Sequence, residues 1–188
     1  MYLNKAQEIA EKLLPAFHKE SSFPHTEVNL RSGAFRNADW HRTTSILSEV
    51  GSIQLELKYL SKHTGDRRFS QHAQKIMEIL DEQPKIFEGL YPSYVNTENG
   101  RFNGDHITLG ALGDSFYEYL LKQFLLTGDE KFHRMYREFV RGLKKHLIGK
   151  SKPNGLVYVG EMRNGVLQTK FDHLVCFTVC SLIFLYLI

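Results

Sequence analysis

Apolar residues recur three or four positions apart over most of the chain, which is the spacing of amphipathic α-helices. This spacing predicts helices, in chain order, over about 6–14, 44–64, 68–80, 115–127, 130–148 and 174–188. Two connecting segments, 94–102 and 156–167, are instead β-prone around an Asn-Gly pair, which favours a tight hairpin turn. The sequence therefore predicts an all-α protein of about six helices with short β-hairpins in its loops.

A short sequence, Thr-Gly-Asp, occurs at 64–66 and again 63 positions later at 127–129. In each copy one predicted helix ends before the glycine and another begins after the aspartate. Glycine tolerates the left-handed conformation that ends a helix, and an aspartate carboxylate caps the next one. Each copy therefore predicts an αα-hairpin with a very short turn. Repeated hairpins of this kind build either an open solenoid or a closed toroid.

Composition agrees with one globular domain and excludes several other classes. The 188 residues are 42% hydrophobic and 24% charged, and their net charge of +3 is too small to indicate nucleic-acid binding. The first residues lack the basic start and apolar run of a signal peptide. The apolar stretch 174–188 is shorter than the roughly 20 residues of a membrane-spanning helix, which favours a buried core helix. Cys176 and Cys180 lie in this stretch and do not settle the redox compartment.

The glycine-rich start of one predicted helix carries the first candidate for chemistry, Asp114. One interpretation is structural, because Ser115 and Glu118 have the spacing of a capping box and an acid favours the N-terminal end of a helix. The other is functional, because Gly110 and Gly113 allow a ligand to approach closely and an acid beside aromatic residues suits sugar binding. The residues alone leave both interpretations open.

Two further polar residues have the same ambiguity. Glu49 is either a solvent-facing residue of a helix or a site residue, and the nearby Gly51 indicates close packing around it. His173 follows Asp172, a possible helix cap, and is either an ordinary first-turn residue or a ligand-binding one. The sequence contains no zinc-binding H-E-x-x-H or C-x-x-C pair, no P-loop, no dinucleotide-binding glycine motif and no G-x-S-x-G elbow.

Three motifs, at 49–66, 109–122 and 170–177, resemble in order and spacing the α-1,2-mannosidases of glycoside hydrolase family 47. The resemblance extends over about residues 3–177. It implies an (α/α)7 toroid and inverting, calcium-dependent hydrolysis of terminal α-1,2-linked mannose from high-mannose N-glycans. It also implies a location in the lumen of the endoplasmic reticulum or Golgi. The alternative is a non-catalytic glycan-binding relative that acts in glycoprotein quality control.

The resemblance assigns roles to four residues. Asp114 matches a catalytic acid, and Glu49 and His173 match residues that line the terminal mannose site. Leu112 stands where family members that remove one particular mannose carry arginine, and where broader, Golgi-type enzymes carry a smaller apolar residue. Arginine offers a rigid set of hydrogen-bond donors that leucine lacks, so Leu112 predicts trimming of several mannoses in sequence.

The resemblance also implies parts that these residues do not contain. Two catalytic glutamates, the calcium-binding threonine, the disulfide partner of Cys176 and the usual membrane anchor would lie outside them. We therefore expect 1–177 to be part of a catalytic domain truncated at both ends, with an incomplete toroid, and 178–188 to be a divergent apolar tail. The 188 residues alone are expected to be inactive.

Overall fold

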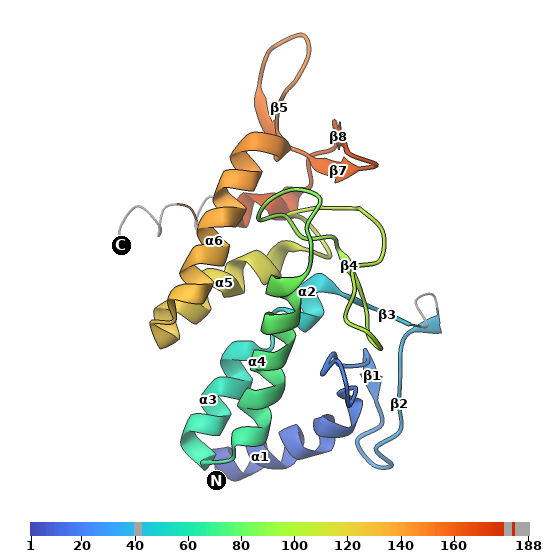
Figure 1. Ribbon diagram of the computed structural model, residues 1–188, viewed down its shortest axis with the longest axis vertical. Coiled ribbons are helices and arrows are strands. Elements are labelled where there is room, and N and C mark those ends of the chain that lie inside the picture. Colours follow the sequence, from blue (N-terminus) through green and yellow to red (C-terminus); the bar gives the residue numbers. More distant parts are fainter. Residues whose placement is uncertain (40–42, 179–181, 183–188) are drawn as a thin grey trace.

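The computed structural model describes residues 1–39, 43–178 and 182, and helices dominate it (Figure 1). Short turns of 3-10 or π type follow α1 at Leu14–Ala16, follow α6 at Leu143–Leu147 and form η4 at His173–Cys176. The all-α prediction is confirmed as a helix-rich chain with small β-hairpins, and the closed ring of seven hairpins stays a prediction. The α-helices are α1 (Tyr2–Leu13), α2 (Leu47–Val50), α3 (Gln54–Thr64), α4 (Arg67–Glu82), α5 (Asp114–Thr127) and α6 (Glu130–Gly142).

The strands form antiparallel pairs in the connections between helices. The β3–β4 pair joins distant parts of the chain and places the start of α2 beside the loop between α4 and α5, where the Leu47 amide donates to the Ser93 carbonyl at 2.9 Å. Within the described residues, no helix is long and apolar enough to cross a membrane. The pairs are β1 (Glu27–Val28) with β2 (Phe35–Arg36), β3 (Thr44–Ile46) with β4 (Tyr94–Asn96), β5 (Ile148–Lys150) with β6 (Val157–Val159), and β7 (Glu161–Arg163) with β8 (Val166–Gln168).

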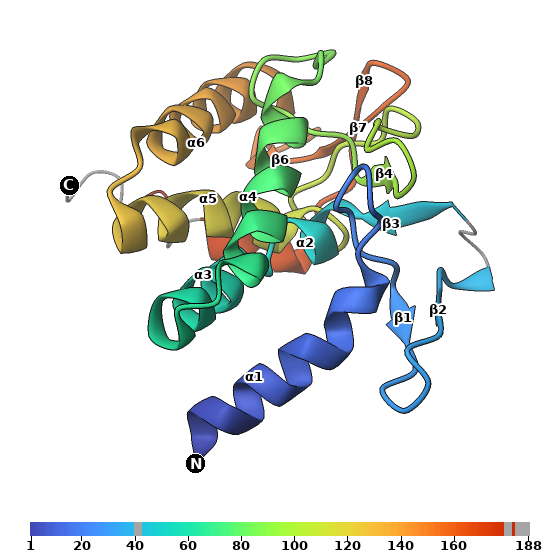
Figure 2. The ribbon, with the colours of Figure 1, turned by 60° about the horizontal axis from the view of Figure 1, so that its bottom comes forward.

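The two Thr-Gly-Asp sequences form the same turn, and they connect α3 to α4 and α5 to α6 (Figures 1 and 2). Gly65 and Gly128 have φ values of 77° and 68°, the left-handed conformation that ends a helix. The Asp66 carboxylate accepts from the Arg68 amide at 3.0 Å, and Asp129 caps α6 in the same way. Both predicted αα-hairpins are confirmed.

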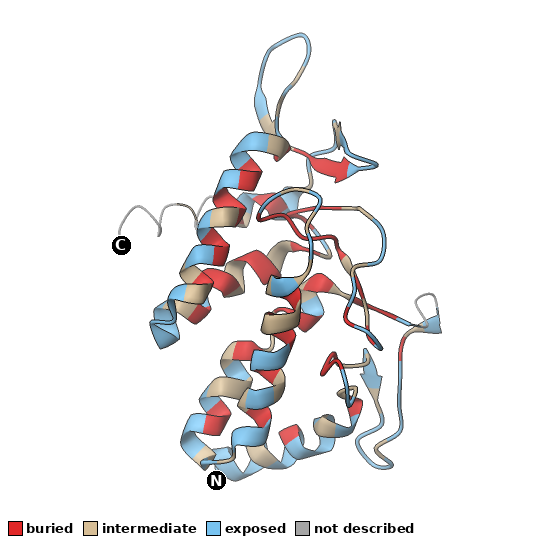
Figure 3. Ribbon diagram, viewed as in Figure 1, coloured by how far each residue is buried: buried red, intermediate tan, exposed pale blue. Residues whose placement is uncertain are grey.

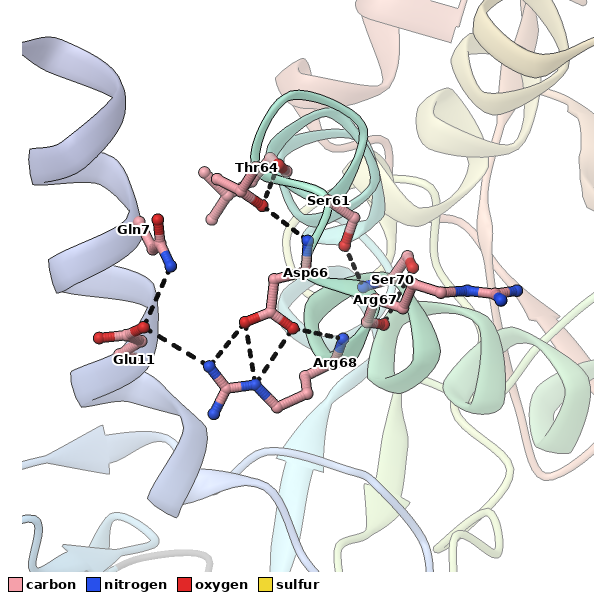
Figure 4. Close-up of polar contacts among 9 residues, drawn as sticks. Gln7, Glu11, Ser61, Thr64, Asp66, Arg67, Arg68 and Ser70 are labelled. Atoms are coloured by element: carbon pink, nitrogen blue, oxygen red, sulfur yellow. Dashed lines mark hydrogen bonds and ion pairs between the residues drawn. The ribbon is translucent and has the colours of Figure 1, made fainter.

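Side chains around the first turn also connect it to α1 (Figure 4). The Asp66 amide donates to the Thr64 hydroxyl at 3.2 Å, so Asp66 is hydrogen-bonded to the last residue of α3 as well as to the first turn of α4. The Arg68 guanidinium forms an ion pair with Asp66 at 2.6 Å and reaches Glu11 of α1 at 3.5 Å. The turn therefore holds α1 by charge as well as by the packing of α1 on α3.

The core lies where α4, α5 and α6 meet the loop that precedes β4 (Figure 3). Tyr91, Phe116, Tyr117 and Phe139 are fully or almost fully buried there. The Tyr117 ring stacks on Phe139 with centroids 4.2 Å apart, and its hydroxyl accepts from the Tyr91 amide at 3.0 Å. Because each buried aromatic side chain stabilises the fold by about 1.5–3 kcal/mol, this cluster holds the loop before β4 firmly against α5.

Apolar side chains remain exposed along an edge formed by α1, α3 and the end of α5. Tyr2, Ile9, Tyr59 and Leu125 expose about half of their surface or more. One groove of about 660 Å³ lies between α1 and α3, and another of about 530 Å³ lies between α3 and α5. A contiguous apolar surface of this kind is typical of a face that packs against another element.

The helix predicted over 44–64 is wrong in its first half. The chain there forms β3, the single turn α2 and then α3, because Ser45 pairs with Val95 and Gly51 ends α2. Leu47 and Val50 are fully buried, and with Leu60 they keep a helix-like spacing across the break. The helix-like spacing of apolar residues therefore continues through a segment in which the helix itself is interrupted.

The predicted hairpins at 94–102 and 156–167 are partly confirmed. Asn164 and Gly165 both have positive φ and form the two-residue turn between β7 and β8. Around Gly100 the turn is wider, and β4 pairs mainly with β3. The start of 156–167 pairs with β5 as β6. The helix predicted over 174–188 begins as η4, and from Val179 onward it lies outside the described residues except for Leu182.

Candidate active site

The segment that carries Glu49 packs against the start of α5. The Ser48 amide donates to the Leu112 carbonyl at 3.0 Å. The Ser115 hydroxyl donates to the Ser48 carbonyl at 3.3 Å. Two hydrogen bonds to the residue before Glu49 therefore connect α2 to the residues on both sides of Asp114.

Gly51 makes this approach possible. A Cβ atom at this position would stand 2.3 Å from Cδ2 of the Phe116 ring and 2.9 Å from the Leu47 carbonyl oxygen. Such distances are too short for any side chain larger than hydrogen. The close packing that Gly51 indicated near Glu49 is confirmed.

A tight turn from Thr108 to Asp114 sets the position of Leu112. The Gly110 amide donates to the Thr108 hydroxyl at 2.9 Å, and the Asp114 amide donates to the Gly110 carbonyl at 3.0 Å. Leu112 has a φ of 84°, which is uncommon for a residue with a Cβ atom. A Cβ atom on Gly113 would stand 2.1 Å from the Thr108 carbonyl oxygen. Backbone strain of this kind, beside a candidate acid, is typical of functional sites.

The third segment reaches the same turn through Asp172. A Cβ atom on Gly110 would stand 2.6 Å from the Asp172 Cβ and Cγ atoms, so the Asp172 side chain lies directly against the Gly110 backbone. The Asp172 carboxylate accepts from the Leu174 amide at 2.9 Å and caps η4, as predicted. The adjacent His173 imidazole is 90% exposed, with Nδ1 3.6 Å from the Asp172 carboxylate.

The four predicted site residues thus lie on three segments that meet at the turn around Gly110. Glu49 and His173 are exposed, whereas Leu112 and Asp114 are half-buried. Their neighbours make the contacts that join the segments, so the four side chains keep surface that a ligand could reach.

The predicted capping box at Ser115 and Glu118 is wrong. Helix α5 begins at Asp114, with Gly113 before it, so Ser115 already lies inside the first turn. The Ser115 amide donates to the Asp114 carboxylate at 2.9 Å. Glu118 forms an ion pair with Lys122 at 2.6 Å. The structural interpretation of this motif therefore loses its capping box, whereas its other part, an acid in the first turn of the helix, is confirmed at Asp114.

A cavity of about 550 Å³ opens beside Glu49, between the end of α1 and the segment from β3 to α3. Its polar lining includes Ser45, Glu49 and Glu56. Leu112, Asp114 and His173 are not among its lining residues in the described part of the chain. The structure therefore connects Glu49 to a cavity on one side and to the Asp114 segment on the other.

Sequence reasoning missed Thr108, whose hydroxyl and carbonyl shape the turn, and Glu161, which is almost fully buried. No local pattern distinguishes Thr108 from other threonines. An acid in the β-prone segment 156–167 was the available signal for Glu161, since acids are uncommon in strands.

The structure does not test the calcium ion that the resemblance implies. In 1–39, 43–178 and 182, no three His, Cys, Asp or Glu side chains are grouped so that they could hold a metal ion. The ligand threonine was expected outside these residues, so the calcium requirement stays a prediction.

The model of glycosyl hydrolase family 47 matches residues 1–185. The chain belongs to this family. The resemblance drawn from the three motifs is thereby confirmed, and the boundary predicted at 178 stays untested. Among the family's members, a mannosyl-oligosaccharide 1,2-alpha-mannosidase of Candida albicans is 45% identical over 182 residues, covering 94% of this chain and 32% of its own. The endoplasmic reticulum mannosyl-oligosaccharide 1,2-alpha-mannosidase of Saccharomyces cerevisiae is 38% identical, covering 94% and 34%.

A solved structure agrees with the fold of this family 47 chain. The alpha-1,2-mannosidase from Trichoderma reesei superimposes with a TM-score of 0.83 at 27% identity, over 93% of this chain and 37% of the other. The chain spans about a third of the length of the curated relatives described above.

Proposed function

We propose that this family 47 chain forms part of the catalytic domain of an α-1,2-mannosidase that trims high-mannose N-glycans in the secretory pathway. The observation that carries the proposal is the meeting of the Glu49, Asp114 and His173 segments at the turn around Gly110. The relatives named as mannosyl-oligosaccharide mannosidases, including the endoplasmic reticulum enzyme of yeast, supply the substrate class and the compartment.

In the proposed reaction Asp114 is one of the acids that flank the glycosidic bond. Inversion requires one carboxyl group to protonate the leaving oxygen and another to activate water, with roughly 6.5–9.5 Å between them. Asp114 is half-buried at the start of α5 and keeps surface toward a ligand. Glu49 and His173 offer acceptors and donors for the hydroxyl groups of the terminal mannose.

The described residues supply one part of such a site rather than all of it. We infer that residues 1–188 alone do not hydrolyse glycans, because a catalytic unit loses nearly all of its rate when one member is missing. The exposed apolar edge on α1, α3 and α5 supports an incomplete toroid, since each hairpin of a repeat fold needs neighbours on both sides. Added calcium should release no mannose from a high-mannose glycan.

The alternative function is a glycan-binding relative without catalysis. The same three segments would bind mannose in that case, and Asp114 would act only as a hydrogen-bond acceptor. The test below separates the two functions because it measures binding and hydrolysis independently.

The test joins this segment to the remaining length of a relative. Residues 1–178 replace the matched segment of the Candida albicans enzyme, and hydrolysis and binding of α-1,2-mannobiose are both measured. We expect hydrolysis, and we expect Asp114→Asn to lower kcat by about 10²–10⁴-fold while thermal unfolding is unchanged. Hydrolysis that survives Asp114→Asn would overturn the catalytic role. Binding without hydrolysis in a folded chimera would favour the binder.

The specificity proposed for Leu112 can be measured in the same chimera. Leu112 is half-buried in the turn before Asp114, with its carbonyl held by the Ser48 amide. Replacing it with arginine adds donors at the rim of the site and narrows the space for different glycan branches. Leu112→Arg should turn a ladder of trimmed products into one dominant isomer in glycan chromatography. An unchanged ladder would contradict this role for Leu112.

A further inference from the structure

Glu161, on β7, is a buried acid surrounded by basic groups. Its side chain is 4% exposed. The Lys170 ammonium lies 2.7 Å from one carboxylate oxygen, and the His106 Nε2 atom lies 3.2 Å from the other. The Arg163 guanidinium stands 3.9 Å away. A buried carboxylate is costly without such partners, so removing one of them would leave its charge uncompensated.

Lys170 and the residue next to Glu161 lead into two of the segments of the candidate site. Lys170 lies two residues before Asp172, the side chain of which contacts Gly110, and three before His173. Beside Glu161, Met162 exchanges two backbone hydrogen bonds with Ile107, at 3.0 and 2.8 Å, at the entrance to the turn that ends in Asp114.

The third connection runs through His106. Its carbonyl accepts from the Ser93 amide at 2.8 Å and from the Ser93 hydroxyl at 3.0 Å. The Ser93 carbonyl in turn accepts from the amide of Leu47, the first residue of α2. Glu49 lies two residues further on. Two routes thus start at the carboxylate, through Lys170 and His106, and a backbone pair beside it joins β7 to the Asp114 segment; together they reach the three segments of the site.

We propose that Glu161 is a positioning residue whose buried carboxylate holds the segments of Glu49, Asp114 and His173 together. The importance of these three segments rests on the proposed function, whereas the mechanical role of Glu161 does not. The role is specific because the partners His106 and Lys170 belong to two separate loops, before α5 and before η4, which Glu161 joins through its two carboxylate oxygens.

The charge of Glu161 supports this role. Burial by itself would raise the pKa of Glu161, but hydrogen bonds from Lys170 and His106 outweigh burial and hold the pKa below its usual value. Burial lowers the pKa of His106, against the effect of Glu161. A neutral His106 with its proton on Nε2 can still donate to Glu161.

Because the pKa of Glu161 is lowered in the folded protein, the stabilising effect of its carboxylate should weaken as pH falls. The stabilising effect of the carboxylate is fully present above the ordinary pKa of a glutamate, near 4.5, and is lost as pH falls through the lower folded value. The groups that face Glu161 are Lys170, Arg163 and His106. The lysine and the arginine keep their charge in this range, whereas His106, whose pKa is lowered by burial, also gains a proton as the solution becomes acidic. The comparison with Glu161→Gln therefore assigns the part of the loss that belongs to the carboxylate.

The test is hydrogen exchange of the full 188-residue chain, with the amides of the α3–α4 hairpin as the internal reference. Glu161→Gln keeps the size of the side chain and removes its charge. It should accelerate exchange at 107–114 and 170–176 by about tenfold or more relative to the reference, because a hydrogen bond to a charged group is lost. The opening of these segments at acid pH, which is expected in the wild type, should disappear in this variant.

Lys170 provides a second pair of variants if Glu161→Gln does not fold. Lys170→Met should accelerate exchange in the same segments, and Lys170→Arg should restore the wild-type rates because it keeps the ion pair. The matched control is Glu130→Gln. The Glu130 carboxylate lies 3.3 Å from the His133 imidazole, so this variant also removes a Glu–His contact, but its glutamate side chain is 81% exposed. It should leave both segments unchanged.

The outcomes separate this inference from the proposed function. Local acceleration with Glu161→Gln and Lys170→Met, rescued by Lys170→Arg, supports the positioning role even if the Candida chimera does not act on α-1,2-mannobiose. Unchanged rates at 107–114 and 170–176, or equal acceleration over the whole chain, would overturn the positioning role even in a chimera that hydrolyses the sugar.

Discussion

The two αα-hairpins of this chain share their turns and differ at their opposite ends. At the Thr-Gly-Asp turns both glycines are left-handed, and both aspartates cap the following helix, at 3.0 and 2.9 Å. At the other ends, α5 is a continuous helix from Asp114, whereas the first hairpin breaks after α2 and resumes at α3. Glu49 and Leu112 occupy equivalent places in the two repeats, and one is helical while the other has a φ of 84°.

This difference shows which parts of the hairpins are determined locally. The conformation of the turns depends on local residues alone, a glycine and a capping acid. The opposite ends are held by tertiary contacts between the repeats, through Ser48, Ser115 and the close approach at Gly51. The candidate site lies at these ends, where the repeat is least regular.

The largest expected difference between the two ends comes from replacing glycine by alanine, at the site ends and at the turns. A Cβ atom at Gly51 or Gly113 would meet other atoms at 2.3 and 2.1 Å, whereas nothing lies within 4 Å of a Cβ atom at Gly65 or Gly128. Alanine should therefore cost about 3 kcal/mol at Gly51 or Gly113 through overpacking. At Gly65 or Gly128 it should cost about 1 kcal/mol, through the left-handed backbone alone.

Urea unfolding of the four variants measures both costs, provided that the m-value stays constant. Equal losses at all four glycines would show that the site ends are as open as the turns. That result would remove the basis for the contrast between the two ends.

The two aspartates at opposite ends of the α5–α6 hairpin sharpen the comparison. Asp129 caps α6 through the Lys131 amide at 2.9 Å, so Asp129→Ala should lower the free energy of unfolding by about 1 kcal/mol. Asp114 lies inside the first turn of α5 and accepts from the next amide, so Asp114→Ala should cost about half as much. A larger loss at Asp114 in thermal unfolding would restore its role as a structural cap.

The sequence predicted the hairpin turns well because their determinants are local. It also predicted Asp172 as a cap and the packing at Gly51. It could not predict the break between α2 and α3, since Ser45 pairs with Val95 far along the chain. The turn around Gly110 depends on Thr108 and Asp172 together, and spacing along the chain does not show that they meet. The family motifs indicated Glu49, Asp114 and His173, but not how their segments are held.

A third prediction concerns a contact between the two hairpins that is made by a residue present in the first repeat only. Lys58 of α3 donates to Gln123 of α5 at 2.9 Å, and its ammonium lies 4.1 Å from the centroid of the Phe132 ring of α6. In the second repeat the equivalent residue is Leu121. Burial lowers the pKa of Lys58 to about 8 from 10.5. Because the unfolded state then binds more protons between these values, stability should rise with pH from about 8 to 10.5.

The rise due to Lys58 should be about 1 kcal/mol, since its ammonium group keeps part of its contact with water. Lys58→Leu, which copies the second repeat, should remove this part of the slope from urea unfolding measured between pH 8 and 10.5. The difference between variant and wild type isolates Lys58 from Lys85, whose pKa is also lowered by burial. Identical slopes in both proteins would show that Lys58 is well solvated.

The smallest expected effect concerns the second residue after each cap, because its side chain contacts different partners in the two repeats. Arg68 contacts both Asp66 and Glu11 of α1, whereas the equivalent Lys131 lies 5.2 Å from the centroid of the neighbouring Phe132 ring. Exposed ion pairs contribute little, so Arg68→Ala should accelerate hydrogen exchange in the last turn of α1 by about two- to fivefold. The increase should be smaller in 1 M salt, where the wild-type pair is already screened. Lys131→Ala is the matched control and should leave α1 unchanged. If both variants loosened α1 equally, its attachment would depend on the packing of α1 against α3 and not on the charge at the first turn.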